Sequence, residues 1–126
     1  MKQGKKNVAR VIFRDMLKII SEKDKSPEKI FEKAIETVKP AMEVRAKRIG
    51  GAVYQIPVEV RPERQLMLAF RWILGAARDK KGAPMAKKLA DELMAAANGE
   101  GSAIKKRDDT VKMAQANKAF AHYAKY

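Results

Sequence analysis

Residues 44–60 read VRAKRIGGAVYQIPVEV, in which two alternating segments flank a Gly-Gly pair. Side chains of unlike type alternate along each segment, and this is the period of a β-strand. Gly50 and Gly51 can take the left-handed backbone conformation that a two-residue hairpin turn requires. The pattern therefore predicts a two-stranded β-hairpin with these glycines at its tip.

This hairpin has no third strand to pair with, because no other segment of the sequence has the two-residue period. Pro57 cannot donate a hydrogen bond to a neighbouring strand, which is typical of a ribbon with an outward-facing edge. We therefore expect the hairpin to pack on helices at its base or to project into a partner.

The sequence before the hairpin predicts two amphipathic helices. The first covers about residues 6–20; the second begins at Ser26-Pro27, with the serine as N-cap, and stops at Pro40. The expected buried stripe of the first helix is Val8, Val11, Ile12, Met16, Ile19 and Ile20. That of the second helix is Ile30, Phe31, Ala34, Ile35 and Val38.

The sequence after the hairpin predicts three more helices. The third runs from Pro62 to about Arg78, the fourth follows Pro84 and is capped by Gly99, and the last begins near residues 108–110. The third helix is expected to bury Leu66, Ala69, Phe70, Ile73 and Ala77. The last two are expected to bury Met85, Leu89, Leu93, Met113, Ala116, Phe120 and Tyr123.

The expected fold class is therefore mainly α, a bundle of about five helices with one protruding two-stranded β-hairpin. The length of 126 residues is that of one domain. We expect a single RNA-binding domain over residues 1–126 with the hairpin inserted at about residues 43–61.

The charge of the chain is strongly positive. Twenty-eight Lys and Arg against 15 Asp and Glu leave a net charge of +13, with a pI near 10.1. Such a surplus repels itself in a compact fold and is typical of proteins that a polyanion neutralises. Nucleic acid is the first candidate and an anionic membrane surface the second; no segment approaches the roughly 18 uncharged apolar residues of a membrane span.

Several kinds of catalytic and metal site are excluded by residue type. The sequence has no cysteine, which excludes disulfides, thiolate metal sites and cysteine nucleophiles. Its single histidine, His122, argues against a histidine-based catalytic or metal site, although carboxylate-only sites remain open. Asp108 and Asp109 are best interpreted as helix-capping residues rather than as paired catalytic carboxylates. We expect no cofactor, no metal and no enzymatic activity.

Basic residues gather at three places that predict phosphate contacts. The first strand of the hairpin contains Arg45, Lys47 and Arg48, and the exit of the hairpin contains Arg61 and Arg64. Seven-residue spacing places Arg64, Arg71 and Arg78 on one helix face, and Lys105, Lys106 and Arg107 form a basic run. Each phosphate contact adds about 0.7–0.9 to the steepness with which the logarithm of the binding constant falls against the logarithm of the salt concentration. The alternative for each place is a solvated, solubilising charged surface.

Aromatic residues offer a second kind of RNA contact, because unpaired bases stack on aromatic rings. Phe70 and Phe120 occupy positions on helical stripes and are expected in the core. Trp72 and Tyr54 are the better candidates for stacking.

Four segments resemble the family of small ribosomal subunit protein seven. These are FEKAIETVKP at 31–40, PAMEVRAKRIGGAVYQIPVEVRPERQ at 40–65, LAFRWILGAAR at 68–78 and SAIKKRDDTVKMAQANKAFAHYAKY at 102–126. The resemblance implies a helical bundle with a protruding hairpin that binds the 3′ major (head) domain of small-subunit ribosomal RNA and nucleates head assembly. It also implies a place near exit-site tRNA and mRNA, beside neighbouring small-subunit proteins, in the ribosome of a bacterial cytoplasm or of an organelle.

The resemblance also implies functional residues. RNA-contacting regions of the family correspond to Lys5 and Lys6, to Arg45, Lys47 and Arg48, and to Lys105, Lys106 and Arg107; the tip near tRNA and mRNA corresponds to Gly50, Gly51 and Val53. From its charge and position we add Arg10 to the RNA-binding set. Family members usually have a basic arm and another helix before the Gly-Lys-Lys segment, which here is Gly4–Lys6. Either this sequence is a fragment of a longer protein, or it is a shortened form specific to its lineage.

Two rivals stay open at this point. One is a regulatory nucleic-acid-binding protein outside the ribosome, such as a ribbon-type or helix-turn-helix DNA-binding protein. The other is an enzyme, which no residue pattern positively supports.

Overall fold

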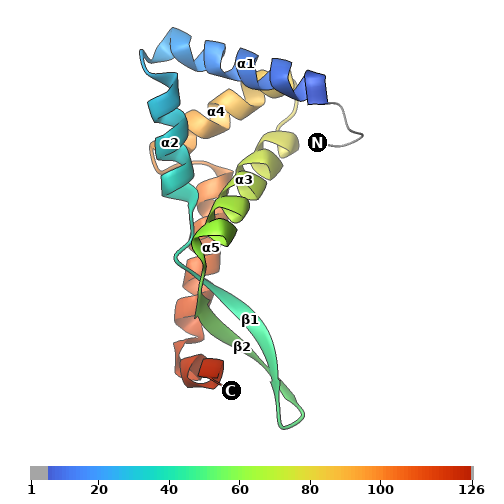
Figure 1. Cartoon of the computed structure of the whole chain (residues 1–126), viewed down its shortest axis with the longest axis vertical. Coiled ribbons are helices and arrows are strands. Elements are labelled where there is room, and N and C mark those ends of the chain that lie inside the picture. Colours follow the sequence, from blue (N-terminus) through green and yellow to red (C-terminus); the bar gives the residue numbers. More distant parts are fainter. Residues whose placement is uncertain (1–5, 126) are drawn as a thin grey trace.

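The structure is a computed structural model, which describes residues 6–125, with side chains to residue 122. The elements follow in the order α1 (Lys6–Lys23), α2 (Pro27–Val38), β1 (Met42–Ile49), β2 (Ala52–Glu59), α3 (Pro62–Asp79), α4 (Met85–Ala97), α5 (Ser102–Ala116) and the 3-10 helix η2 (Lys118–Lys125). The expected bundle with a protruding hairpin is confirmed (Figure 1). Helix α1 lies across the end of the molecule opposite the hairpin.

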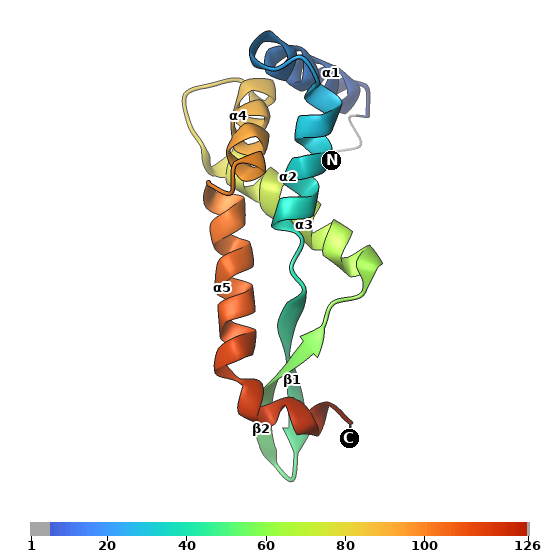
Figure 2. The same cartoon turned by 90° about the vertical axis from the view of Figure 1, so that its left-hand side faces the viewer.

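The hairpin forms as its turn residues require. Strands β1 and β2 pair antiparallel, with Ile49 opposite Ala52 and Met42 opposite Glu59. Gly50 and Gly51 have φ angles of 57° and 89°, the left-handed values that a two-residue turn needs at both positions. Helix α5 runs from the bundle towards the hairpin, and η2 packs on β2 near its far end (Figure 2).

Helix α2 begins and ends where the prolines predict. Pro27 occupies its first turn, Val38 is its last residue, and Pro40 follows as a buried residue. Ser26 is the N-cap residue as predicted, although its hydroxyl makes no capping hydrogen bond. Instead the backbone N–H of Ser26 donates to Asp24 Oδ1 at 2.9 Å, so the preceding turn supplies the local acceptor.

The core lies where α4 meets the other helices. Leu89 and Leu93 are buried as predicted, and Met16, Ile20, Ala34, Ile35, Val38 and Ile73 pack in the same cluster. Most other members are alanines, among them Ala69, Ala77, Ala90, Ala96 and Ala103. Small side chains at the contacts allow the helix axes to approach closely.

In α1 and α3, four residues predicted to be buried are exposed. In α1, Val8 and Val11 are 51% and 45% exposed, because the inward face runs through Ala9, Ile12 and Met16. In α3, Leu66 and Phe70 are 40% and 38% exposed. The buried stripe of α3, which meets α4 and α5, is Leu68, Ala69, Ile73, Ala76 and Ala77.

The last helix begins earlier than predicted, at Ser102 rather than near residues 108–110. Its cap comes from another helix, since the buried carboxylate of Glu92 accepts the backbone N–H of Ala103 at 2.9 Å. The basic run Lys105–Arg107 is therefore helical rather than part of a loop, and the capping role of Asp108 and Asp109 is wrong.

The expected core residues of the last helix are also wrong in part. Met113 is 52% exposed and Ala116 is exposed, because the second half of α5 leaves the bundle for the hairpin. The helix ends at Ala116, and in η2 the ring of Phe120 packs on Tyr54 of β2 with centroids 5.3 Å apart. Tyr54, expected to stack on bases, thus stacks on the protein. The side chain of Tyr123 lies outside the described residues.

Candidate nucleic-acid interface

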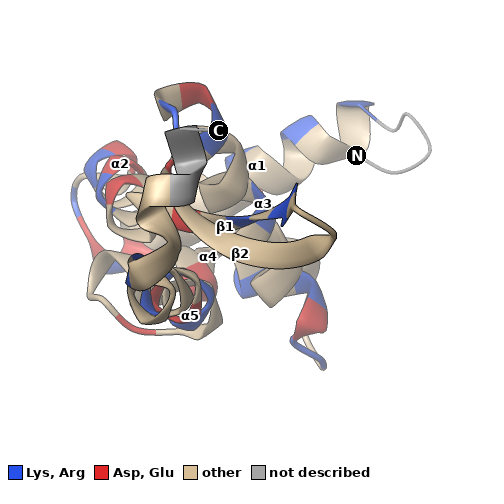
Figure 3. Ribbon diagram, turned by 90° about the horizontal axis from the view of Figure 1, so that it is seen from below, with Lys and Arg blue, Asp and Glu red and all other residues tan. Residues whose placement is uncertain are grey.

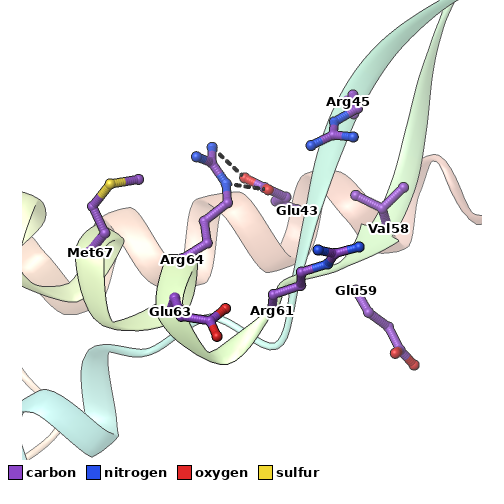
Figure 4. A pocket seen from close by; sticks show the side chains of 8 residues that line it. All are labelled: Glu43, Arg45, Val58, Glu59, Arg61, Glu63, Arg64 and Met67. Atoms are coloured by element: carbon purple, nitrogen blue, oxygen red, sulfur yellow. Dashed lines mark hydrogen bonds and ion pairs between the residues drawn. The ribbon is translucent and has the colours of Figure 1, made fainter.

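Three arginines surround a hollow of about 690 Å³ at the base of the hairpin. Arg45 comes from β1, Arg61 from the link after β2, and Arg64 from the first turn of α3. Figure 4 shows their guanidinium groups around the hollow, while the carboxylates of Glu59 and Glu63 lie below them in that view. Because Arg45 and Arg61 are exposed, their charges can reach a phosphate.

Arg64 is already engaged within the protein. Its Nε and Nη2 donate to the two carboxylate oxygens of Glu43, at 2.6 and 3.1 Å (Figure 4). The hydrogen bond to Glu43, and then the negative charge of that carboxylate, raise the pKa of Arg64. This bidentate pair ties the start of α3 to β1 and leaves the guanidinium only partly available to a ligand.

The basic residues of the hairpin all belong to β1, since β2 contains no Lys or Arg. Figure 3 shows this asymmetry as blue on β1 beside a tan β2. Alternation places Arg45 and Lys47 on one face and Arg48 on the other, where it lies opposite Val53. The ribbon therefore presents cations to both sides, which suits a ribbon lying between two phosphate backbones. Arg45 and Arg48 are exposed, whereas Lys47 is half-buried.

A second basic surface lies where α3 packs on α5. Arg71, Arg78 and Lys106 line a hollow of about 410 Å³ together with Trp72 and Asp79. The predicted stripe of Arg64, Arg71 and Arg78 is thus divided: two members meet Lys106, and Arg64 turns to Glu43.

Arg107 makes contacts that link two helices. Its Nε and Nη2 donate to Asp108 Oδ1 at 3.0 and 2.6 Å, and its Nη1 donates to the backbone carbonyl of Thr37 in α2. It therefore holds α5 against the end of α2, and its role toward RNA stays a prediction. Lys105 is exposed.

The remaining predicted residues lie at the two ends of the molecule. Lys6 and Arg10 are exposed on α1, far from the hairpin (Figure 1). Lys5 lies outside the described residues. At the hairpin tip, Gly50 and Gly51 are exposed and the side chain of Val53 is 61% exposed.

The described part of the chain offers no built metal site, since it has no group of three or more His, Cys, Asp or Glu side chains that could hold an ion. Within those same residues, no helix has both the length and the apolar character needed to cross a membrane.

Sequence reasoning missed the buried carboxylate of Glu92 and its ion pair with the partly exposed Lys80, whose Nζ lies 3.2 Å from Glu92 Oε2. A signal was present, because Glu92 lies three residues after Leu89 and four before Ala96 and so shares their inward helix face. A carboxylate at such a position is normally paired and hydrogen-bonded.

Comparison with known proteins agrees with the resemblance. Residues 1–118 match the family model of ribosomal protein S7p/S5e. The small ribosomal subunit proteins uS7 of Nitratiruptor sp. and Thermotoga neapolitana are 58% and 55% identical to the chain, over 98% of it and 80% of their own length. That of Rhodopirellula baltica is 54% identical over 98% of the chain and 81% of its own length. The chain therefore belongs to the ribosomal protein S7p/S5e family, which is a structural and non-enzymatic one.

Proposed function

We propose that this chain is a structural component of the small ribosomal subunit that binds the 3′ major (head) domain of its ribosomal RNA and nucleates assembly of the head. Family membership supports the ribosomal role, and bacterial relatives support a ribosome in the cytoplasm. The observation that carries RNA binding is the projecting hairpin with all its basic residues on β1. Residues 1–126 act as one RNA-binding domain, beside neighbouring small-subunit proteins.

The RNA-binding surface consists of the two hollows, both faces of β1, and basic residues near the start of α1 and in the first half of α5. Its members are Lys5, Lys6, Arg10, Arg45, Lys47, Arg48, Arg61, Arg64, Arg71, Arg78, Lys105, Lys106 and Arg107. Arg64 and Arg107 have protein partners, so they contribute mainly by holding the elements that carry the others. The net charge of +13 supports the assignment, because RNA phosphates neutralise a surplus that otherwise opposes compaction.

RNA selectivity tests the proposal directly. We expect the chain to bind a fragment of the 3′ major domain far more tightly than duplex DNA of equal charge, and to keep this preference at raised salt. Equal affinities for the two would support a DNA-binding regulatory protein instead. Lys33→Ala is the matched control for removal of a basic residue, because Lys33 is exposed on α2 and lies outside the proposed surface.

The hairpin tip lies near exit-site tRNA and the mRNA path. Support comes from its narrow two-glycine turn and from the exposed apolar side chain of Val53. The chain has no cysteine, so Val53→Cys creates a single attachment point for an iron chelate that cleaves nearby RNA. In reconstituted subunits with bound tRNA and mRNA we expect cleavage of both from residue 53 and of neither from a Lys33→Cys control. The same result from both positions, or cleavage of ribosomal RNA alone, would refute this placement.

A further inference from the structure

We propose that the hollow between α3 and α5 binds one unstacked nucleotide of RNA, with its base on the indole of Trp72 and its phosphate held by Arg71, Arg78 and Lys106. This inference rests on the proposed function, since it names a contact that an RNA-binding surface would make. It differs from general phosphate binding because it requires a base to leave its stack and enter the protein.

The size of the hollow fits one nucleotide. Its volume is about 410 Å³, within the roughly 300–1,000 Å³ of sites that enclose small ligands. Gly75 and Ala76 contribute part of its lining. A Cβ placed on Gly75 would meet nothing within 4 Å, so open space lies above this residue. An RNA duplex is too wide for such a space, whereas a single base with its phosphate is not.

The charges of the hollow suit a phosphate. Arg71 and Arg78 project from one face of α3, and Lys106 comes from α5; all three side chains are exposed. Among the described residues none of the three has a hydrogen-bond or ion-pair partner, unlike Arg64 and Arg107. Ser102, the first residue of α5, also lines the hollow.

Trp72 supplies a platform for the base. It is the only tryptophan of the chain, and it is half-buried, packed in part against the core while it also lines the hollow. A ring fixed in this way loses little freedom when a base stacks on it, and unstacked bases are the usual target of aromatic side chains in RNA recognition. The other stacking candidate, Tyr54, is occupied by Phe120.

Asp79 gives the site an orientation. Asp79 also lines the hollow. A carboxylate here repels a phosphate but can accept hydrogen bonds from the N–H groups of a base edge. The nucleotide therefore places its base edge toward Asp79 and its phosphate toward the cations.

The test uses the full chain and a fragment of the 3′ major domain of small-subunit ribosomal RNA. Because Trp72 is the sole tryptophan, its fluorescence reports the site without a label. We expect RNA to quench this emission and to protect the indole from acrylamide. Trp72→Leu removes the platform, and Gly75→Leu fills the hollow without a change of charge. Each should weaken RNA binding by about tenfold.

Gly75→Ala is the matched control, because its methyl group meets nothing and leaves most of the hollow open. Its RNA affinity should equal that of the unchanged protein, and circular dichroism should show that all three variants are folded. If the unchanged protein binds this RNA tightly and both Trp72→Leu and Gly75→Leu bind it with the same affinity, the nucleotide site is refuted and the proposed function stands. This holds whether or not RNA quenches the emission of the unchanged protein. Failure of the unchanged protein to bind this RNA would overturn both.

Discussion

The carboxylate of Glu92 in α4 accepts a hydrogen bond from the backbone N–H of Ala103 in the first turn of α5, at 2.9 Å. Glu92 is only 1% exposed, and its second oxygen lies 3.2 Å from Lys80 Nζ. One buried side chain thus caps a helix and joins α4 to both the loop before it and the helix after it. The start of α5 in turn positions Lys106 at the hollow between α3 and α5.

Removal of this cap should destabilise the fold. We expect Glu92→Ala to lower the free energy of unfolding by about 1–3 kcal/mol, because it leaves the buried N–H of Ala103 unpaired and removes the ion pair with the partly exposed Lys80. Glu92→Gln keeps an acceptor for Ala103 and should lose about 1 kcal/mol. Urea unfolding measures both. Asp91→Ala, which breaks only the surface pair with Lys87, should change stability by less than about 1 kcal/mol; equal losses for Glu92→Ala and Asp91→Ala would contradict the capping role.

Gly101 should resist substitution because of the same carboxylate. Its φ is 97°, and a Cβ there would lie 2.9 Å from Glu92 Oε1. We expect Gly101→Ala to lower the unfolding free energy by about 1–3 kcal/mol. Gly75→Ala is the control of opposite sign and should stabilise by about 0.5–1 kcal/mol, since Gly75 is helical and has open space around it. Thermal denaturation that shifts both variants in one direction would show that backbone geometry does not decide these effects.

The pair of Arg64 and Glu43 should stiffen the base of the hairpin. It joins residues 21 positions apart in β1 and α3. We expect Arg64→Ala and Glu43→Gln each to speed amide hydrogen exchange in both strands, and the double variant to resemble either one, because both changes remove the same contact. Arg61→Ala, for which no such contact is present among the described residues, serves as the control. Additive effects of the two changes would argue against a direct coupling.

Arg107 and Lys106 should behave differently although they are neighbours. Arg107 binds the carbonyl of Thr37, so Arg107→Ala should mainly lower stability, by about 1–2 kcal/mol. Lys106→Ala and Arg48→Ala should leave unfolding unchanged, lower RNA affinity and reduce the log–log salt slope by about 0.7–0.9 each. Unfolding and filter-binding titrations on the same three proteins separate the two classes. If Arg107→Ala changes only the salt dependence of RNA binding and not the stability, the structural role assigned to Arg107 is wrong.

Local residue chemistry predicted much of the fold. The hairpin and helix α2 were predictable because Gly50, Gly51, Pro27 and Pro40 restrict the backbone around themselves. The prediction of buried residues on α1 and α3 was less accurate. The helical period identifies an apolar stripe, but it does not show which part of that stripe another helix covers. Phe70 follows the period of α3, yet it is 38% exposed and its ring lies beside Phe31, with centroids 6.2 Å apart.

The candidate site shows the same division. The sequence alone sufficed for the basic strand of the hairpin, its turn and the family to which the chain belongs, since these depend on residues that are neighbours along the chain. Tertiary packing decided that Arg64 meets Glu43, that Arg107 meets Thr37, and that α5 begins at Ser102 under a cap from Glu92. It also decided that Arg71, Arg78 and Lys106 surround Trp72. The physical reason is that the partner of a side chain depends on which helix packs beside it. The local backbone preferences of a segment do not determine which distant segment that will be.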